Sequence, residues 1–436
     1  MLRLSAAGGI AMSSDNTVEF AGKCHLDGRA SDPRSLGWMQ GFPPPPEKQV
    51  AFEGESWLQF PQLRWSLSHM RELVPTVAIH RGQGRSKPLG VASTADESII
   101  DALEFTDTTG RILRFSDALT DTYTDGIIVL HRGRVVYERY FGALEAHLPH
   151  ACFSVTKSYA GTLTAILVHE RVLDPLETIP HYLPEIRGTA WEDATLRQVM
   201  DMETGLDYSE NEIDDRSSSS IYMRACRTRP QPADYDGPRT SSDFLLTVRK
   251  EGEHGRAFAY KSVNTQLLAW ITARATGRAF AQLLHEKLWA PLGCEEDGYM
   301  VVDPAGMPSA SGGLYTSLRD LARFGELMRR GGEWDGRQVI PDAVVDDIRR
   351  GGDRRKFAIG SYAESLPGYS YRSQWWHSHN ELDAVEARGI HGQRLYIAPK
   401  AEMVVARFAS HPLAASAFND PITMPQMLAL GRALRG

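Results

Sequence analysis

Hydrophobic positions in the second quarter of the chain follow first the pattern of strands and then that of a helix. In "DGIIVLHRGRVVYERYFG" (residues 125–142), two β-branched runs flank Arg132-Gly133, which predicts a β-hairpin. The stretch "SVTKSYAGTLTAILVHERV" (residues 154–172) has apolar side chains at helical spacing and ends near Asp174-Pro175. A hairpin is therefore expected, followed after a short connection by a helix.

The middle of the chain is mostly of helical pattern, and strand patterns return near the C-terminus. "TLRQVMDMETGL" and "SVNTQLLAWITARATG" predict helices, with Gly205 and Gly277 where C-terminal caps are expected. "LYTSLRDLARFGELMRRGG" predicts an amphipathic helix that stops at Gly331-Gly332, and "QRLYIAP" and "EMVVARFA" predict strands before a closing helix, "PQMLALGRALRG". This order predicts an α+β fold with a helical insertion between parts of one sheet.

The first part of the chain lacks this regularity. Residues 1–115 are predicted to be an N-terminal extension that packs on a main body formed by residues 116–436, within which a helical subdomain covers roughly 176–300. The proline run Pro43–Pro46 predicts extended polyproline II, as a rigid connector or, less favoured, an SH3-type ligand. The Trp- and Leu-rich "ESWLQFPQLRWSLSHMREL" is expected to contact the body.

Composition narrows the class of protein. Of the 436 residues 42% are hydrophobic and 24% charged, as in soluble globular proteins. The net charge of −7 and the lack of a basic run argue against nucleic acid or a membrane as partner, and no apolar stretch is long enough to span a bilayer. The four cysteines form no C-x-x-C pair, and "MLRLSAAGGIAMSSDN" is a weak signal peptide. We therefore expect a cytoplasmic protein without disulfides or structural zinc.

The sequence "HACFSVTKSYAG" brings a serine and a lysine together. Ser154 and Lys157 form the one S-x-x-K of the chain, and residues three apart share a helix face. A serine hydroxyl needs help to lose its proton before it attacks a carbonyl, and a free N–H at a helix start favours the developing oxyanion. A Ser/Lys pair at this spacing also arises by chance. Its position at a predicted helix start favours nucleophile chemistry.

A second motif, "FAYKSVNTQ", lies at the start of another predicted helix. Tyr260 is expected to act as a base if the ammonium of Lys157 lowers its pKa, and Ser262 and Asn264 follow on the same turn. A tyrosine here could equally be a core residue with its hydroxyl satisfied. Tyr260 becomes a catalytic candidate only because it accompanies the S-x-x-K pair.

A third motif, "EARGIHGQRLYIAP", precedes a predicted strand. Gly389 and Gly392 flank Ile390 and His391, and glycines allow close approach of the backbone to a ligand. The Ile390 amide is the best candidate to complete an oxyanion hole. The alternative is an ordinary glycine-containing entry to a strand.

Taken in order, these motifs resemble those of the serine β-lactamase and penicillin-binding-protein superfamily, S-x-x-K, then Y-x-N or S-x-N, then K-T-G or H-x-G. Further stretches, such as "LRQVMDMETGLDYSE" and "SGGLYTSLRDLARFGELMRRGG", are most similar to its carboxylesterase-type branch and, within that, to 6-aminohexanoate-dimer (nylon-oligomer) hydrolases. The resemblance covers about residues 30–430. It implies a β-lactamase/DD-peptidase-like fold, with an antiparallel sheet flanked by helices and an all-helical subdomain.

The resemblance also implies roles for individual residues. Ser154 matches the nucleophile, Lys157 the motif lysine and Tyr260 the catalytic tyrosine, and the amides of Ile390 and Ser154 match the oxyanion hole. The neighbouring motif residues are expected to contact substrate, namely Ser262, Asn264, Glu212, Gly389 and His391.

The chain departs from the family pattern at three places. Ser262 stands where many relatives have Asn, and Ala387-Arg388-Gly389 replaces K-T-G, so β-lactam turnover should be poor unless Arg388 points inward. In "GLDYSENEIDD", Glu212 falls where nylon-oligomer hydrolases have a tyrosine that assists the amide leaving group, and Tyr208 is expected to be structural. Esters, which have better leaving groups than amides, are therefore favoured as substrates.

The sequence thus predicts a serine hydrolase that cleaves small or medium carboxylic esters through an acyl-serine, without metal or cofactor. An amidase acting on short linear amides is the first alternative, and a non-catalytic ligand-binding relative is the second. G-x-S-x-G and H-E-x-x-H are absent, and His377 and His379 are expected to be solvated rather than metal-bound. Substrate identity stays open, as does assembly, for which a homodimer is possible.

Overall fold

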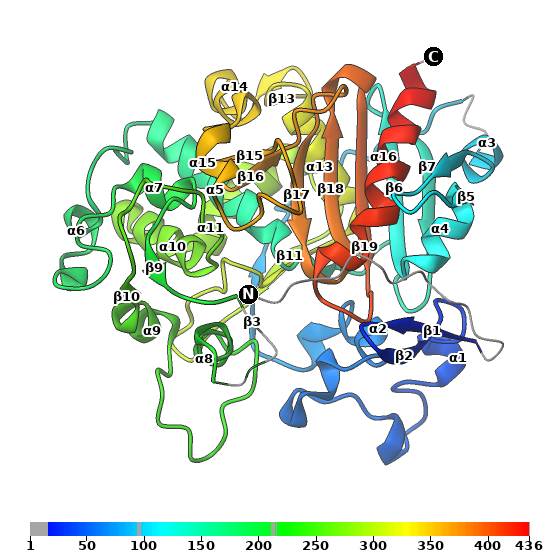
Figure 1. Ribbon diagram of the computed structural model, residues 1–436, viewed down its shortest axis with the longest axis horizontal. Coiled ribbons are helices and arrows are strands. Elements are labelled where there is room, and N and C mark those ends of the chain that lie inside the picture. The colour runs from blue at the N-terminus through cyan, green and yellow to red at the C-terminus, as the bar shows by residue number, and fades with distance from the viewer. Residues whose placement is uncertain (1–15, 94–96, 211–213, 215, 436) are drawn as a thin grey trace.

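The largest element of the molecule is an antiparallel sheet of seven strands. The computed structural model describes residues 16–93, 97–210, 214 and 216–435 (Figure 1). In sheet order the strands are β15 (Ser370–Arg372), β16 (Trp375–His377), β17 (Val385–Gly389), β18 (Gln393–Ala398), β19 (Met403–Ala409), β6 (Thr124–His131) and β7 (Arg134–Tyr140). Because β6 pairs with β19, the sheet joins segments far apart in the sequence.

The predicted hairpin is confirmed as β6 and β7. Their register runs from Gly126 opposite Tyr140 to His131 opposite Arg134. Arg132 and Gly133 between them both have positive φ, 52° and 77°. This is the turn geometry that matches the twist of the two strands, and it explains the Arg-Gly dipeptide.

Helices cover both faces of this sheet. Successive residues of β6 point to opposite sides, so Ile127 packs in the cluster beneath α16 (Asp420–Arg435) and Ile128 packs in the cluster beneath α13 (Leu318–Arg329). In Figure 1, α16 lies in front of the sheet and α13 behind it. The expected α+β fold is confirmed. Smaller elements complete this part of the chain: α3 (Glu97–Asp101), β4 (Glu104–Thr106), β5 (Ile112–Arg114), α4 (Phe115–Asp121), β13 (Glu333–Trp334), β14 (Arg337–Gln338), α14 (Asp342–Arg350) and α15 (Arg354–Ala358).

The helix predicted after the hairpin is α5 (Val155–His169), and it runs through the centre of the molecule. All but its last two residues are buried. The strand that precedes α5 in the sequence is β8, which forms one edge of a four-stranded sheet. The strands of this sheet are β3 (Thr76–Ile79), β11 (Gly298–Val301), β12 (Leu314–Thr316) and β8 (His150–Ala151).

Between α5 and β11 the chain is mostly helical, on the left of Figure 1. The helix predicted at 262–277 is confirmed, and Gly277 caps it with φ of 66°. The prediction that Gly205 caps a helix is wrong. That helix ends at Met200, and Gly205 lies beside a strand where a Cβ would come 2.6 Å from the Glu251 carbonyl oxygen. The elements are α6 (Ile179–Tyr182), α7 (Leu196–Met200), β9 (Leu206–Asp207), α8 (Ser218–Ala225), α9 (Ser241–Thr247), β10 (Arg249–Lys250), α10 (Val263–Thr276), α11 (Phe280–Leu284) and α12 (Ala290–Leu292).

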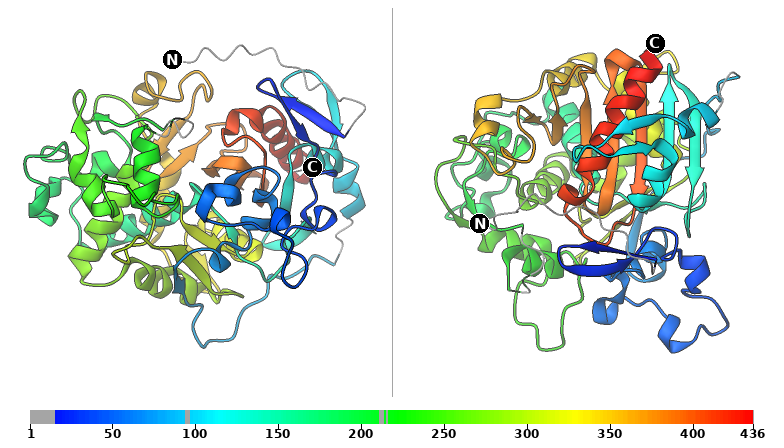
Figure 2. Two further views of the ribbon diagram at one scale, coloured as in Figure 1. Left: turned by 90° about the horizontal axis from the view of Figure 1, so that it is seen from below. Right: turned by 45° about the vertical axis from the view of Figure 1, so that its right-hand side comes forward.

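The N-terminal segment lies below the seven-stranded sheet in Figure 1 and in the right-hand view of Figure 2. Trp57 and Met70 are buried in one apolar cluster with Tyr299 and Tyr315 of the four-stranded sheet. The proline run is only partly extended, because a 3-10 turn begins at Pro46. The elements of the segment are β1 (Thr17–Phe20), β2 (Lys23–Leu26), α1 (Pro33–Leu36), a 3-10 segment (Glu53–Leu58) and α2 (Leu63–Ser66).

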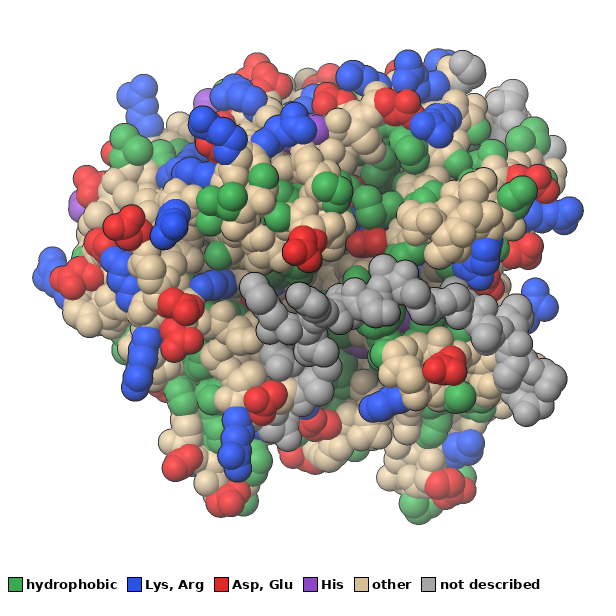
Figure 3. Space-filling view, viewed as in Figure 1, with side chains coloured by type: hydrophobic (Ala, Val, Ile, Leu, Met, Phe, Trp, Pro, Cys, Tyr) green, Lys and Arg blue, Asp and Glu red, His purple; other side chains and the backbone are tan. Residues whose placement is uncertain are grey.

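The surface carries charges of both signs. Figure 3 shows Lys and Arg side chains interspersed with Asp and Glu over one face, in keeping with a net charge of −7. Among the residues described above, none of the helices combines the length and apolar character that crossing a membrane requires.

Candidate active site

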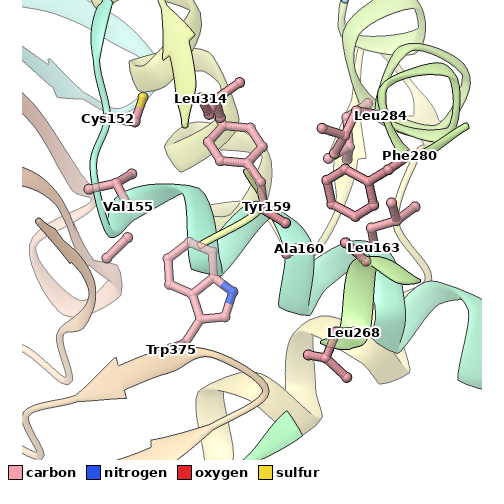
Figure 4. Close-up of a cluster of buried hydrophobic side chains, with 14 of the residues drawn as sticks. Cys152, Val155, Tyr159, Ala160, Leu163, Leu268, Phe280, Leu284, Leu314 and Trp375 are labelled. Atoms are coloured by element: carbon pink, nitrogen blue, oxygen red, sulfur yellow. The ribbon is translucent and has the colours of Figure 1, made fainter. Parts of the chain in front are cut away.

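Ser154 and Lys157 meet at the start of α5. Ser154 occupies the position before the first helical residue, and the Lys157 ammonium donates a hydrogen bond to its Oγ at 2.8 Å. The same Nζ donates to the Ser311 carbonyl at 2.7 Å, and Lys157 is only 2% exposed. The helix that carries both is fixed by its own core, in which Val155 and Tyr159 pack with Trp375 (Figure 4).

The backbone before Ser154 makes a sharp turn. Phe153 has φ of 43°, a conformation that a bulky side chain adopts only when its surroundings impose it, at a cost of about 1–3 kcal/mol. On its N-terminal side, Ala151 is held in the four-stranded sheet opposite Tyr315. The turn from strand to helix presents Ser154 at the wall of a pocket instead of burying it in either element.

Tyr260 approaches Ser154 from the loop before α10. Its hydroxyl shares a hydrogen bond with Ser154, and the Lys157 Nζ lies over its ring, 5.1 Å from the centroid. The ring stacks on Trp376, with centroids 5.4 Å apart. The structure therefore brings together the three groups that the separate motifs supplied.

The expectation of a lowered pKa for Tyr260 is wrong. Burial raises the pKa of Tyr260 well above its usual value of about 10, and Tyr371, Tyr362 and Glu210 act in the same direction. The hydrogen bond with Ser154 opposes this shift without reversing it. Near neutral pH the residue is thus a phenol, which can accept one proton only by giving up its own.

Ile390 and Ser154 both line the same pocket. Ile390 begins a 3-10 turn directly after β17, and an N–H at a helix start has no partner within that helix. Gly389 lets β17 approach the chain that leads to Ser154, since a Cβ on it would lie 2.7 Å from the Cys152 carbonyl oxygen. Both residues therefore lie at the pocket, each at the start of a helical turn.

Ser262 also lines the pocket, and its partner is a residue that the sequence analysis missed. Its amide and hydroxyl both donate hydrogen bonds to the carboxylate of Glu210. Burial raises the pKa of Glu210, while Lys157 and Ser262 pull it down. The closeness of Glu210 to Glu212 in the sequence was the available signal. Glu212 itself lies outside the residues that the structure describes.

Two other residues predicted to contact substrate, Asn264 and His391, have side chains that form hydrogen bonds away from the pocket. Asn264 is fully buried, with its amide bonded to Thr204 and to the Lys261 carbonyl. His391 is buried with Nδ1 at 2.7 Å from the His411 carbonyl oxygen, and burial lowers its pKa to about 4. Neither residue is among those that line the pocket.

Arg388 does not point into the site. Its guanidinium bonds to Glu386 and Asp420 in a buried network and lies over the ring of Trp376. Ala387 is fully buried. Strand β17 therefore supplies no cation to the site at the position that matches the lysine of K-T-G.

The expectation that His377 and His379 are solvated is wrong for His377, which is 3% exposed. The two rings stack with centroids 3.9 Å apart, and burial lowers the pKa of His379 to about 4. Within the described ranges, no group of three or more His, Cys, Asp or Glu residues is arranged to hold a metal ion. The four cysteines are all free thiols.

The pocket extends from Ser154 toward three parts of the chain. One is the N-terminal segment, another the helical region around α8, and the third the loop that joins β11 to β12. A pocket wall near residues 205–240 is expected from the sequence, but the individual residues of the three walls form no local motif that would identify them. They include Trp57, Leu58, Met70, Tyr208, Ser219, Tyr222, Met223, Thr228, Val301, Ser309, Ser311, Gly312, Gly313 and Tyr315.

An α+β fold with a serine–lysine pair at the start of a buried helix, beside a tyrosine and at the wall of a pocket, defines a serine hydrolase. Comparison with known families agrees with this class. The family model described as Beta-lactamase matches residues 116–422, and the chain belongs to that family.

Within this family, the chain is similar to proteins named as 6-aminohexanoate-dimer hydrolases. The chain is 33% identical over 361 residues to 6-aminohexanoate-dimer hydrolase of Paenarthrobacter ureafaciens, covering 82% of this chain and 88% of the relative. A solved structure named "Putative 6-aminohexanoate-dimer hydrolase from Bacillus anthracis" has 31% identity and a TM-score of 0.79, covering 87% of this chain and 96% of its own. A family VIII carboxylesterase, with 16% identity and a TM-score of 0.54, covers 73% and 96% and shares the fold.

Proposed function

We propose that the protein hydrolyses small and medium carboxylic esters through an acyl intermediate on Ser154. The observation that carries this proposal is the 2.8 Å hydrogen bond from the buried Lys157 ammonium to Ser154 Oγ, beside the Tyr260 hydroxyl. A serine hydroxyl held by a cation and by a second proton-transfer group at a pocket wall is placed for attack on a carbonyl carbon.

In the proposed acylation step, Ser154 Oγ bonds to the carbonyl carbon while its proton passes to the Tyr260 oxygen. Tyr260 gives its own proton to the leaving-group oxygen, so that it ends the step neutral. This relay suits a phenol whose pKa burial raises, because no free phenolate is required. The positive charge of Lys157 stabilises the negative charge that develops on the serine oxygen.

The amides of Ser154 and Ile390 are proposed to hold the oxyanion of the tetrahedral intermediate. Deacylation follows the same route, with a water proton passing to Tyr260 as Tyr260 returns its proton to Ser154 Oγ. Preorganised backbone donors of this kind contribute about 3–4 kcal/mol to transition-state stabilisation in serine hydrolases.

Hydrolysis of short linear amides is the second candidate, supported by the 33% identity to a 6-aminohexanoate-dimer hydrolase. Ester hydrolysis is favoured because Tyr260 is the proton donor on which the leaving group would depend. An alkoxide or phenoxide needs less help to leave than an amide nitrogen does. The lack of a cation from β17 further argues against substrates, such as β-lactams, whose carboxylate requires one.

Turnover of matched substrates tests this choice. We expect the protein to hydrolyse p-nitrophenyl butyrate with kcat/KM at least about a hundredfold above that for the matched p-nitroanilide and for a 6-aminohexanoate dimer, reflecting the poorer leaving group of an amide. Equal or higher efficiency on the linear amide would favour the second candidate. Absence of both activities, together with failure of a fluorophosphonate to label the protein, would reject the proposed function.

A further inference from the structure

The pocket beside Ser154 has an apolar wall that comes from outside the part of the chain matched by the family model. That match begins at residue 116, whereas Trp57, Leu58 and Met70 of the N-terminal segment line the pocket. Trp57 and Met70 belong with Val301 to one buried apolar cluster, and Leu58 packs against that cluster. We call Trp57, Leu58 and Met70 the N-terminal wall.

The N-terminal wall reaches the nucleophile through Phe153. This residue is packed against the same apolar cluster and directly precedes Ser154. An acyl group bonded to Ser154 Oγ therefore starts next to the wall. The contact puts apolar surface within reach of the first carbons of the acyl chain.

The leaving group lies on another side of Ser154. It must face the Tyr260 hydroxyl, which the proposed relay uses as proton donor. Tyr260 packs with Trp376 and Phe258 in an apolar cluster that shares no residue with the N-terminal wall. The two halves of an ester bound at Ser154 thus face different clusters. The leaving group faces the cluster around Tyr260, and the acyl half faces the N-terminal wall, which lines the pocket.

The N-terminal segment is also fastened across the pocket to the helical region. The Arg229 guanidinium donates to the Glu55 carboxylate at 2.8 Å and to Ser220 Oγ at 3.1 Å. Glu55 lies two residues before Trp57, and Thr228, the neighbour of Arg229, lines the pocket. The Arg229 side chain is 13% exposed and that of Glu55 is 29% exposed. The contact between them holds the wall near the helical region instead of leaving it on the outer surface.

We propose that the N-terminal wall binds the acyl chain and sets its preferred length, so that the natural substrates are esters of apolar, unbranched medium-chain acids. This inference rests on the proposed function, because it concerns the acyl half of the same intermediate. Each methylene buried against the wall is expected to raise kcat/KM about fourfold, until the chain meets the end of the pocket.

Leu58 is the residue to vary, because it is half-buried and its replacement leaves the core of the cluster intact. The expected result for Leu58→Ala is a shift of the p-nitrophenyl ester optimum toward longer acyl chains. For Leu58→Trp, the ratio of octanoate to acetate kcat/KM should fall about tenfold. Leu73→Ala is the matched control, since Leu73 packs on the same cluster without lining the pocket and should leave the ratio unchanged.

Rates of Ser154 labelling by fluorophosphonates with short and long alkyl chains give a second readout that does not depend on deacylation. They should shift in the same direction as the ester ratios. If the octanoate-to-acetate ratio of kcat/KM in both Leu58 variants stays within about twofold of wild type while Ser154-dependent turnover is intact, the wall does not bind the acyl chain. The proposed function would still stand. If the wild-type protein shows neither ester turnover nor labelling that depends on Ser154, both the wall's role and the proposed function are overturned.

Discussion

Ser154→Ala is expected to lower kcat for p-nitrophenyl butyrate by at least about ten-thousand-fold, to the level left by binding and the oxyanion donors alone. Alanine retains the backbone amide proposed for the oxyanion hole and removes only the oxygen that Lys157 holds at 2.8 Å. The measurement is steady-state hydrolysis alongside the wild-type protein, with the melting temperature recorded for each variant.

Ser158→Ala is the matched control for this substitution. Ser158 lies on the same helix and is buried, but its hydroxyl donates to the Gln374 carbonyl at 2.8 Å and does not line the pocket. Its replacement should change kcat by less than about threefold if the variant remains folded. A Ser154→Ala variant that kept activity within about tenfold of wild type would show that another residue performs the attack.

Tyr260→Phe is expected to lower kcat by about a hundredfold to ten-thousand-fold, with a much smaller change in KM. Phenylalanine preserves the ring that stacks on Trp376 and lies beneath the Lys157 ammonium, and removes only the proton-transfer oxygen. The matched control is Tyr371→Phe. Among the described residues the Tyr371 hydroxyl has no hydrogen-bond partner, and burial, the largest cause of the raised Tyr260 pKa, remains without it, so kcat should stay nearly unchanged.

The ionisation of Tyr260 provides a readout that a structural role would not affect. Because burial raises its pKa, the residue stays protonated as pH rises through the neutral range, and ionises only above the ordinary tyrosine value of about 10. The ultraviolet difference spectrum between wild type and Tyr260→Phe should therefore show no phenolate band near neutral pH. A band there, together with a kcat/KM profile that follows it, would indicate a phenolate base in place of the relay.

The candidate site could be predicted wherever a local motif marked it. Ser154 and Lys157 lie one helical turn apart, so their contact follows from the geometry of any helix that begins at this position. Tyr260 is over a hundred residues away in the sequence, and the resemblance to a known family placed it beside them. The hairpin β6–β7 was predictable for a similar reason, since Arg132-Gly133 is a turn signal in itself.

What the sequence did not reveal depends on tertiary context. The pKa of Tyr260 rises because the side chain is buried and because Tyr371 and Tyr362 lie close to it, and no local pattern carries that information. The N-terminal wall escaped prediction because Leu58 and Met70 are ordinary apolar residues whose position at the pocket is set by packing on the four-stranded sheet.

Gly205 and Arg388 show the same limit. A glycine after a helical pattern is usually a cap, yet Gly205 is required because the backbone at Glu251 of the same chain approaches it closely. The direction of the Arg388 side chain is set by Glu386 and Asp420, which bind it in a buried network.

The central claim is that Ser154 forms the covalent intermediate. The most direct test is to react the protein with a fluorophosphonate until ester hydrolysis stops, and then to locate the adduct by peptide mass spectrometry. The account predicts one phosphonyl group per chain, on Ser154, formed in proportion to the lost activity and absent from Ser154→Ala. Complete inhibition with the adduct on any other residue, or with Ser154 unmodified, would contradict it.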